Sequence, residues 1–190
     1  MIIIVGPSGS GKSTVIRRLI EDLPFLAFSI SATTRTKRDG EIDGKDYYFL
    51  SKADFEAKAA NNAFIEFEEV YKGRYYGTLS SEIERIKAGG KMPIMDIDVK
   101  GAKRIFFNHP DLQHLSIFLH PGSEEILYER LKNRGTDNEA EIKKRLKVAK
   151  EELQQAEDFK HIVYNTDLET TVSQIKSLIV PFAQKAGLMV

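Results

Sequence analysis

The 190-residue sequence has no cysteine, no net charge and no long apolar run. Without cysteine, disulfide scaffolds, thiolate zinc sites, iron–sulfur clusters and a cysteine nucleophile are excluded. The 28 basic side chains equal the 28 acidic ones, so the chain lacks the basic excess of a nucleic-acid coat or a polybasic membrane binder. The apolar stretch Met1–Val5 is too short for a membrane span or a signal core. We therefore expect a cytoplasmic protein that binds neither nucleic acid nor membrane.

What is present is an ordinary globular composition, with 42% apolar and 29% charged residues. Its length predicts one domain, or one domain with an inserted lobe. Short apolar runs alternate with amphipathic segments, which predicts an α/β fold, a parallel sheet covered by helices on both faces. The expected strands of this sheet are residues 2–5, 25–30, 93–97, 115–119 and 161–164. The expected helices are residues 13–23, 123–134, 139–159 and 168–187, the last interrupted near Pro181.

The segment 35–90 breaks this alternation, because it is rich in charge, glycine turns and aromatic residues. Short aromatic strands are expected at 47–50 and 64–70. An insertion of this length in a compact domain tends to be functional. The chain is therefore predicted to form a core, residues 1–34 with 91–190, and an inserted lobe of mixed strands and short helices, residues 35–90.

The first expected strand leads into Gly6-Pro7-Ser8-Gly9-Ser10-Gly11-Lys12-Ser13, which matches the phosphate-loop pattern G-x-x-x-x-G-K-[ST] in full. Glycines let backbone N–H groups converge on phosphate oxygens, and the following helix adds the positive end of its dipole. Lys12 is expected to reach the β- and γ-phosphates of a nucleoside triphosphate, and the Ser13 hydroxyl to ligate Mg²⁺. A Rossmann fingerprint is excluded, because Thr14 stands where its third glycine would be.

Two further charged pairs point toward phosphate chemistry. Arg35 and Arg38 follow an expected strand end, and guanidinium forks suit a dianionic phosphate, although a solvated basic turn would look the same. Asp96 and Asp98 end an apolar run, and ligands of open α/β sheets bind beyond the carboxyl ends of strands. One carboxylate could face an acceptor and the other a Mg²⁺ water shell, or both could serve strand-end turn chemistry.

Several motifs, in order and at close to the expected spacing, resemble the guanylate kinase family over nearly the whole chain. They are the segment Ser29–Tyr47, Phe64-Ile65-Glu66, Tyr75-Tyr76-Gly77-Thr78, Asp96-Ile97-Asp98 and Arg130-Leu131-Lys132-Asn133-Arg134-Gly135-Thr136. The resemblance implies a P-loop NTPase-type parallel core flanked by helices. It also implies an inserted mixed α+β lobe that binds GMP and a short helical lid at about 124–146.

The resemblance implies that Glu66 reads guanine and that two arginines and two tyrosines hold the phosphate of GMP. One carboxylate can accept both N1–H and N2–H₂ of guanine, whereas adenine presents a lone pair at N1. The alternatives are a solvent-facing Glu66 and ordinary turn or capping roles for Ser31 and Thr78. The implied GMP-binding residues are Ser31, Arg35, Arg38, Tyr47, Glu66, Tyr76, Thr78 and Asp96.

On the donor side, the resemblance implies that residues 6–14 bind ATP and that Asn165 borders its adenine. Mg²⁺ would accompany ATP, held by Ser13 and, through water, by Asp98. The expected catalytic groups are Lys12 and the lid arginines Arg130, Arg134 and Arg145, which would neutralise charge on the transferring phosphoryl group. The alternative for these arginines is surface pairing with glutamates such as Glu129 and Glu141.

The resulting expectation is an ATP:GMP phosphotransferase that forms ADP and GDP and also accepts dGMP. Two rivals are a non-catalytic guanylate-kinase-like module that binds proteins and a P-loop kinase for another small acceptor. An intact Lys12 argues against the first, and Glu66 with Arg35 against the second. The sequence leaves a monomer and a homodimer equally open.

Overall fold

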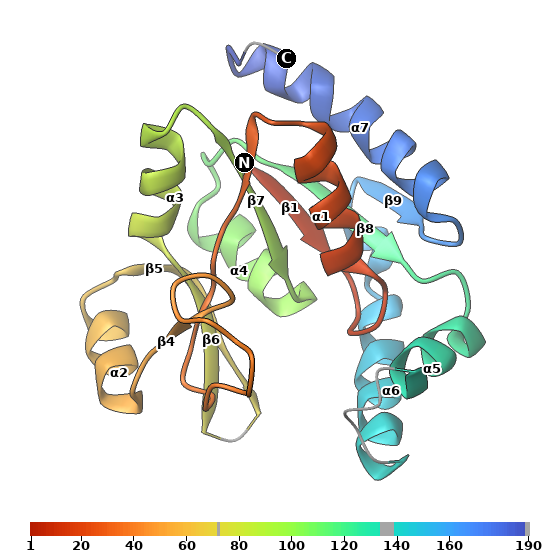
Figure 1. The fold of residues 1–190 in the computed structure, drawn as a ribbon, viewed down its shortest axis with the longest axis horizontal. Coiled ribbons are helices and arrows are strands. Elements are labelled where there is room, and N and C mark those ends of the chain that lie inside the picture. The colour runs from red at the N-terminus through yellow and green to blue at the C-terminus, as the bar shows by residue number, and fades with distance from the viewer. Residues whose placement is uncertain (72, 134–138, 189–190) are drawn as a thin grey trace.

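A computed structural model describes residues 1–71, 73–133 and 139–188. Its main sheet has five parallel strands in the order β2-β7-β1-β8-β9, which confirms the expected α/β core (Figure 1). The strands are β1 (Ile2–Val5), β2 (Leu26–Phe28), β7 (Met92–Ile97), β8 (Leu115–His120) and β9 (His161–Tyr164). All five lie where strands were expected, and β2 is shorter than predicted.

The central strand β1 has no exposed side chain, because helices cover both faces of the sheet. Ile2 and Ile4 point toward one face, which α1 and α7 cover, while Ile3 and Val5 point toward the other, which α3 and α4 cover. This alternation follows from the two-residue period of a strand. The covering helices are α1 (Lys12–Asp22), α3 (Ser80–Ala88), α4 (Val99–Asn108) and α7 (Leu168–Lys185).

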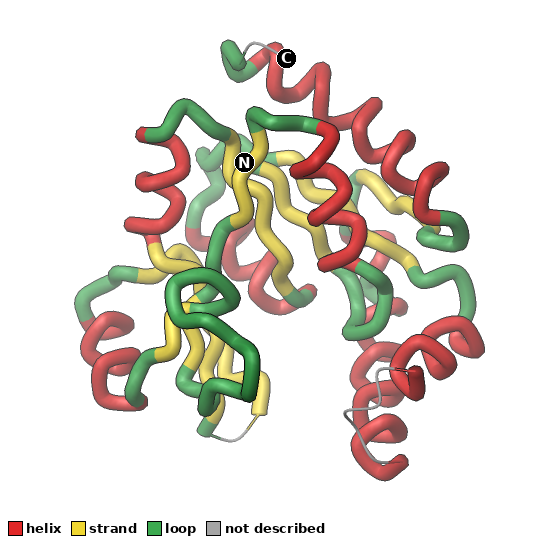
Figure 2. Tube along the Cα trace, in the orientation of Figure 1, coloured by secondary structure: helices red, strands yellow, loops and turns green. Residues whose placement is uncertain are grey.

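A second sheet forms the inserted lobe, below and to one side of the main sheet in Figure 2. Its four strands follow the order β4-β3-β6-β5, with β3 parallel to β4 and the other pairs antiparallel. They are β3 (Ala32–Thr33), β4 (Tyr48–Phe49), β5 (Phe64–Tyr71) and β6 (Arg74–Leu79), with helix α2 (Lys52–Ala60) beside them. The expected mixture of strands and short helices is present, although the sequence had not indicated β3 or β6.

An aromatic cluster holds this lobe together. Phe55 of α2 is 1% exposed, stacks on Phe64 with 4.4 Å between ring centroids and lies 5.5 Å from the ring of Tyr75. We expect Phe55→Ala to lower the free energy of unfolding by about 3–5 kcal/mol, because it removes a buried ring and leaves a cavity. Urea denaturation measures this loss, and a change below 1 kcal/mol would show that the cluster is not the core of the lobe.

Helices α5 (Glu124–Asn133) and α6 (Glu139–Leu153) pack against each other beyond β8, away from the sheet. Their contact is a small apolar core of Leu127, Leu131, Ile142 and Ala149. The Ser123 hydroxyl accepts a hydrogen bond from the N–H of Ile126 at 3.3 Å, as expected of an N-cap. Arg134, the remaining lid arginine, lies outside the described residues.

Two helix predictions were wrong in detail. The helix expected over 139–159 ends at Leu153, and a 3₁₀ turn, Ala156–Asp158, follows. The chain turns there because Phe159 packs into the core beside Phe106 and Phe118.

The C-terminal helix α7 runs through Pro181 to Lys185 without interruption. Proline costs a helix one hydrogen bond. Pro181 lies on the solvent side, where water can satisfy the freed carbonyl group. No helix within the described ranges is both long and apolar enough to cross a lipid bilayer.

Candidate active site

The phosphate loop lies between β1 and α1, at the carboxyl end of the central strand. Its glycines are required by the backbone. Gly6 and Gly11 have φ of 148° and 95°, and a Cβ at Gly6 would lie 2.6 Å from the carbonyl oxygen of Leu119. A Cβ at Gly11 would lie 2.3 Å from Nδ2 of Asn165. Larger residues at either position would therefore displace the loop from β8 or from Asn165.

Lys12 curls back over this loop. Its Nζ donates hydrogen bonds to the carbonyl oxygens of Gly6 at 2.6 Å and Pro7 at 3.1 Å, and lies 3.6 Å from Oδ1 of Asp96. The Ser13 hydroxyl donates to Oδ2 of the same Asp96 at 3.3 Å. Asp96 is the second-last residue of β7, which pairs in parallel with β1. The fold thus joins one carboxylate to both the lysine and the hydroxyl of the loop.

Asp98, two residues further on, has another structural task. Its side chain is the N-cap of α4 and accepts a hydrogen bond from the N–H of Gly101 at 2.7 Å. In the described parts of the chain, no group of three or more His, Cys, Asp or Glu side chains could hold a metal ion. Oxygen donors for Mg²⁺ are nevertheless present in Ser13 and Asp96, which fits an ion that takes few protein ligands.

Arg130 and Asn165 close the other side of the loop. Arg130 donates from Nη1 to the carbonyl oxygen of Ser10 at 3.1 Å and from Nη2 to that of Asn165 at 2.7 Å. Asn165, only 5% exposed, donates from Nδ2 to the same Ser10 oxygen at 2.7 Å. A cavity of about 300 Å³ opens here, lined by Gly9, Gly11, Thr14, Arg130, Asn165 and Leu168.

Helix α6 also reaches the loop, since Arg145 donates from Nη1 to the hydroxyl of Ser8 at 3.1 Å. Two of the three lid arginines therefore contact the phosphate loop directly.

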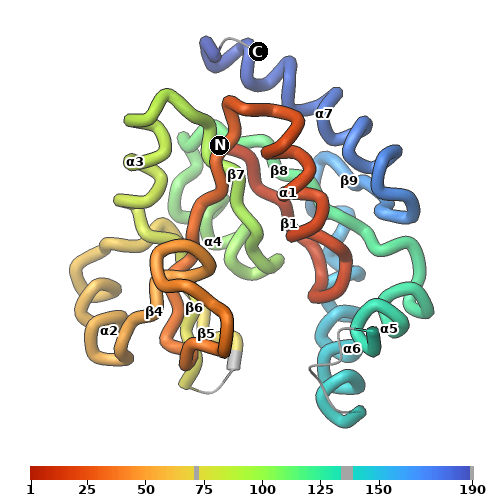
Figure 3. The backbone as a smooth tube through the Cα atoms, in the orientation of Figure 1, coloured from red at the N-terminus to blue at the C-terminus, as the bar shows by residue number. Residues whose placement is uncertain are grey.

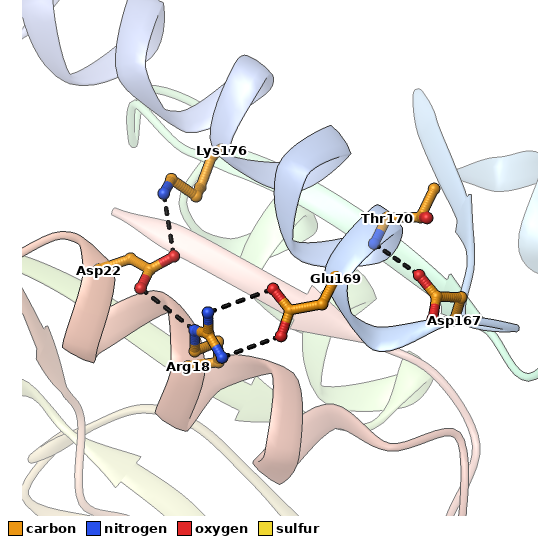
Figure 4. A network of polar contacts seen from close by, with 6 residues as sticks. All are labelled: Arg18, Asp22, Asp167, Glu169, Thr170 and Lys176. Carbon is orange, nitrogen blue, oxygen red and sulfur yellow. Dashed lines mark hydrogen bonds and ion pairs between the residues drawn. The ribbon is translucent and has the colours of Figure 1, made fainter.

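A polar network joins α1 to α7 on the same side (Figure 4). Arg18 of α1 lies between Asp22, at 3.2 Å, and Glu169 of α7, whose two oxygens accept at 2.9 and 3.2 Å. Asp167 caps α7 by accepting from the N–H of Thr170 at 2.8 Å. The network fixes the first turn of α7, and with it the segment that begins at Asn165, against the helix that follows the phosphate loop.

In the lobe, Arg35 lies between acidic and aromatic partners. Its guanidinium donates to both oxygens of Glu41, at 2.8 and 2.7 Å, and lies 5.1 Å from the ring centroid of Tyr47. The hydrogen bonds from Arg35 hold the pKa of the Glu41 carboxyl down at about 2. Tyr76 lies beside Tyr47, with ring centroids 6.0 Å apart, and hydrogen bonding to Glu41 and Tyr76 raises the pKa of Arg35.

Arg38 is exposed in the next turn, where its backbone N–H donates to Glu41 at 2.7 Å. Four of the predicted residues, Arg35, Arg38, Tyr47 and Tyr76, therefore surround one corner of the lobe. The sequence analysis missed Glu41, although an acidic residue three positions after an arginine of the predicted site was a signal that could have found it.

Glu66 lies in a nearly closed environment on β5, with 7% of its surface exposed. Burial, partly offset by the hydrogen bond from Thr78, raises the pKa of its carboxyl to about 7. The Thr78 hydroxyl donates to Oε1 at 2.7 Å, because an irregularity between Phe64 and Glu66 sets Glu66 opposite Thr78 in the ladder. Bulges of this kind are common beside functional sites, where they re-aim a side chain.

Gly101 is a second residue that sequence reasoning missed. A Cβ at this position would lie 2.9 Å from Oε2 of Glu66, so the first turn of α4 approaches the buried carboxylate at close range. Helix α4 begins at Val99, three residues after Asp96, so the chain runs from the partner of Lys12 to the turn beside Glu66 within a few residues. Ser31, by contrast, is half-buried in the connection into the lobe, and its carbonyl oxygen accepts from the N–H of Tyr48 at 2.9 Å.

Comparison with known proteins agrees with this geometry. The sequence model of the guanylate kinase family matches residues 1–181. The chain is 47% identical over 186 residues to a guanylate kinase of Porphyromonas gingivalis, covering 97% of this chain and 98% of that one. It is 41% identical over 179 residues to a guanylate kinase of Carboxydothermus hydrogenoformans, covering 94% and 86%.

The fold is similar to the crystal structure of guanylate kinase from Anaplasma phagocytophilum, with a TM-score of 0.73 at 29% identity over 100% of this chain and 86% of that one. The phosphate loop, the inserted lobe and the sequence relatives all indicate the same family. The chain belongs to the guanylate kinase family and is a nucleoside monophosphate kinase, a transferase.

Proposed function

We propose that this enzyme transfers the γ-phosphoryl group of Mg·ATP to GMP, and also to dGMP, and forms ADP and the guanosine diphosphate. The observation that carries the proposal is the buried Glu66–Thr78 pair beside the α4 turn that follows Asp96. It supports the proposal because a carboxylate suited to guanine lies against the first turn of α4, and the strand before that helix carries Asp96, the partner of Lys12 and Ser13. The proposed division is a core, a GMP lobe of about 32–79 and a lid of about 124–146; the lobe bounds differ from 35–90 because β3 belongs to the lobe sheet and α3 packs on the main sheet.

Guanine would bind to Glu66 through its N1–H and N2–H₂ donors. The hydroxyl of Thr78 already orients the carboxylate, and the burial of the pair leaves little water to compete. A site built to hydrogen-bond its substrate rejects an analogue that lacks the group by about 10⁴-fold or more. Ser31 and Asp96 would complete the proposed acceptor site.

The phosphate of GMP would bind at the corner of Arg35, Arg38, Tyr47 and Tyr76. A guanidinium has five N–H donors, of which Glu41 and the Thr36 carbonyl take three from Arg35. The other donors of Arg35, where Tyr76 is also a partner, would serve the phosphate. The ion pair with Glu41 holds Arg35 in place before the substrate arrives.

The phosphates of ATP would lie in the phosphate loop, where the Lys12 ammonium would exchange its loop carbonyl contacts for phosphate oxygens. Ser13 and Asp96 would hold Mg²⁺, directly or through water, whereas Asp98 caps α4. The chemistry that Mg²⁺ supplies when bound is neutralisation of phosphate charge. Asn165 and the cavity beside it provide the proposed adenine site.

Transfer itself needs positioning and charge neutralisation more than covalent chemistry. Lys12, Arg130 and Arg145 already lie around the loop that would hold the transferring group, and Arg134 is proposed to join them. Closure of the lobe and lid would exclude water, which is a competing acceptor.

A coupled assay of ADP release tests the proposal, with Mg·ATP and with GMP, dGMP, AMP, CMP and UMP in turn. Turnover with GMP and dGMP alone is the expected result. Turnover with another monophosphate would overturn the role of Glu66 as the guanine reader. Binding of GMP without any turnover would favour a non-catalytic binding module.

The pKa of Glu66 gives this proposal a pH dependence. Only the ionised carboxylate accepts both guanine donors, and with a pKa of about 7 it is about one-tenth ionised at pH 6 and about nine-tenths at pH 8. We therefore expect the affinity for GMP to rise roughly tenfold from pH 6 to pH 8 through this group.

Isothermal titration calorimetry over this range measures the effect. The GMP phosphate also titrates, with a second pKa near 6, so the Glu66→Gln variant serves as the control for that contribution. Equal pH dependence in the wild type and the variant would contradict the prediction.

A further inference from the structure

A buried carboxylate outside the proposed substrate contacts joins the core to the lobe. The side chain of Glu82, in the first turn of α3, is only 1% exposed. Oε1 accepts a hydrogen bond from the backbone N–H of Ile30 at 3.0 Å and Oε2 accepts one from the hydroxyl of Tyr48 at 2.9 Å. Arg85 donates to both oxygens, from Nε at 2.8 Å and from Nη2 at 2.9 Å.

These partners lie where the chain passes between the two sheets. The chain leaves the main sheet after β2, through the connection that contains Ile30, and returns from β6 into α3 (Figure 3). Glu82 lies in the helix to which the chain returns, and it accepts a hydrogen bond from Ile30 in the outgoing connection. Tyr48 belongs to the lobe strand β4. One carboxylate thus joins the outgoing and the returning connections to the lobe sheet.

Residues of the proposed GMP site lie close in sequence to Ile30, Tyr48 and Glu82. Ser31 follows Ile30, Tyr47 precedes Tyr48, and Thr78, in β6, lies four residues before Glu82. Successive strand residues point to opposite faces, so Tyr47 faces Arg35 while Tyr48 reaches Glu82. A shift at Glu82 would therefore move all three substrate-facing positions together.

Four donors satisfy Glu82 fully, which is what keeps a buried carboxylate ionised. Burial raises its pKa, but the hydrogen bonds from Arg85, Ile30 and Tyr48 outweigh that effect, and the pKa is lowered overall. Its place in the first turn of α3 adds a favourable interaction with the helix dipole. The group has no vacant position for a substrate, so its role is to hold its partners.

We propose that Glu82 is a positioning residue that sets the angle of the lobe on the core in the ligand-free protein, and so the geometry in which the acceptor site meets GMP, without touching either nucleotide. The inference rests on the proposed GMP site for its kinetic consequence. Its structural consequence, a defined angle between lobe and core, does not depend on that site.

Kinetics test the first consequence through Glu82→Gln, which keeps the size of the side chain but points an amide NH₂ at donor groups. We expect the KM for GMP to rise about tenfold or more while the KM for ATP stays within twofold, because the phosphate loop does not depend on this link. Tyr48→Phe removes one of the four bonds and should raise the KM for GMP about threefold. In the Glu82→Gln background it should add little, because the two residues share one interaction.

Glu84→Gln is the matched control, an exposed glutamate on the same helix, and its kinetics should equal those of the wild type. Thermal unfolding of each variant excludes loss of the fold as the cause. Equal rises in the KM for GMP and for ATP, or none in a folded Glu82→Gln protein, would overturn the proposal. If Glu82→Gln does not fold, Tyr48→Phe decides by the same criterion.

Distance measurement tests the second consequence. Because the natural chain has no cysteine, cysteines placed at Lys58 on α2 and Gln174 on α7, both exposed, allow specific spin labelling of lobe and core. In the ligand-free protein, we expect the distance distribution to broaden in Glu82→Gln and to stay unchanged in Glu84→Gln. An unchanged distribution in Glu82→Gln would refute the positioning role. Absence of GMP turnover in the wild type would refute only the proposed function.

Discussion

Replacing Lys12 with alanine is expected to lower the turnover number on the order of 10³-fold while the fold survives. The ammonium already lies inside the curl of the phosphate loop, bonded to the carbonyl oxygens of Gly6 and Pro7. A preorganised charge at this position costs no reorganisation when negative charge shifts in the transition state, and loss of one such donor typically costs 10²–10³ in rate. Steady-state kinetics with saturating GMP and Mg·ATP measure the effect.

Two further variants sharpen this test. Lys12→Arg keeps the positive charge but replaces a compact ammonium with a planar fork, which does not fit the narrow curl, and should recover little activity. Lys185→Ala, at the exposed end of α7, should leave turnover unchanged. A folded Lys12→Ala protein within tenfold of the wild-type rate would remove Lys12 from the catalytic groups.

The second large effect is expected of Glu66→Gln, which should lower kcat/KM for GMP on the order of 10³-fold and leave the binding of ATP nearly unchanged. A glutamine offers one acceptor and one donor where guanine presents two donors, so one buried pair would face donor to donor. The hydrogen bond from Thr78 can persist on the remaining oxygen. Kinetics with GMP and direct titration with ATP distinguish the two sites.

The same substitution should not destabilise the protein at pH 8. The Glu66 carboxyl has a pKa of about 7 in the fold against an ordinary value of 4.5, so the folded state retains a proton that the unfolded chain has released between these pH values. The contribution of Glu66 to stability therefore falls as the pH rises through that window. Glutamine does not titrate, so the stability of the variant should not show this decrease as the pH rises.

Thermal unfolding at pH 5 and pH 8 checks this expectation, with Glu56→Gln, an exposed change on α2, as the control. A variant that is less active but no less stable at pH 8 is the signature of a functional carboxylate. Equal loss of affinity for GMP and ATP, together with a lower melting temperature, would instead indicate a structural role for Glu66.

Local chemistry made much of the fold predictable. The run Ile2–Val5 could only be a strand buried on both faces, and the glycines after it could only form a turn followed by a helix. The lobe was visible as a break in the alternation, but β3 and β6 were not, since a two-residue strand and a strand with few aliphatic side chains carry little periodic signal. The end of α6 at Leu153 was missed because it depends on the packing of Phe159 into the core. The continuity of α7 was missed because it depends on the exposure of the turn that contains Pro181.

Much of the candidate site was predictable from residue types, but the pairings among those residues were not. Both Asp96 and Asp98 stand at a strand end, and nothing in their spacing says which one approaches Ser13. The start of α4 decides it, since Asp98 is held as the N-cap and Asp96 is left toward the loop. Gly101 and Glu82 were overlooked because they act through contacts with residues far away along the chain, Glu66 in one case and Ile30 and Tyr48 in the other.

The chemistry of the phosphate loop follows from local residues, because a glycine turn, a lysine and a hydroxyl within eight consecutive residues need no distant partner to assume their geometry. The surroundings of that loop depend on tertiary contacts. Asn165 and Arg130 reach Ser10 from more than a hundred residues away, and Glu66 meets Thr78 through an irregular ladder. Such contacts depend on strand order, register and helix packing, which are set by burial of the whole core and not by any local run of residues.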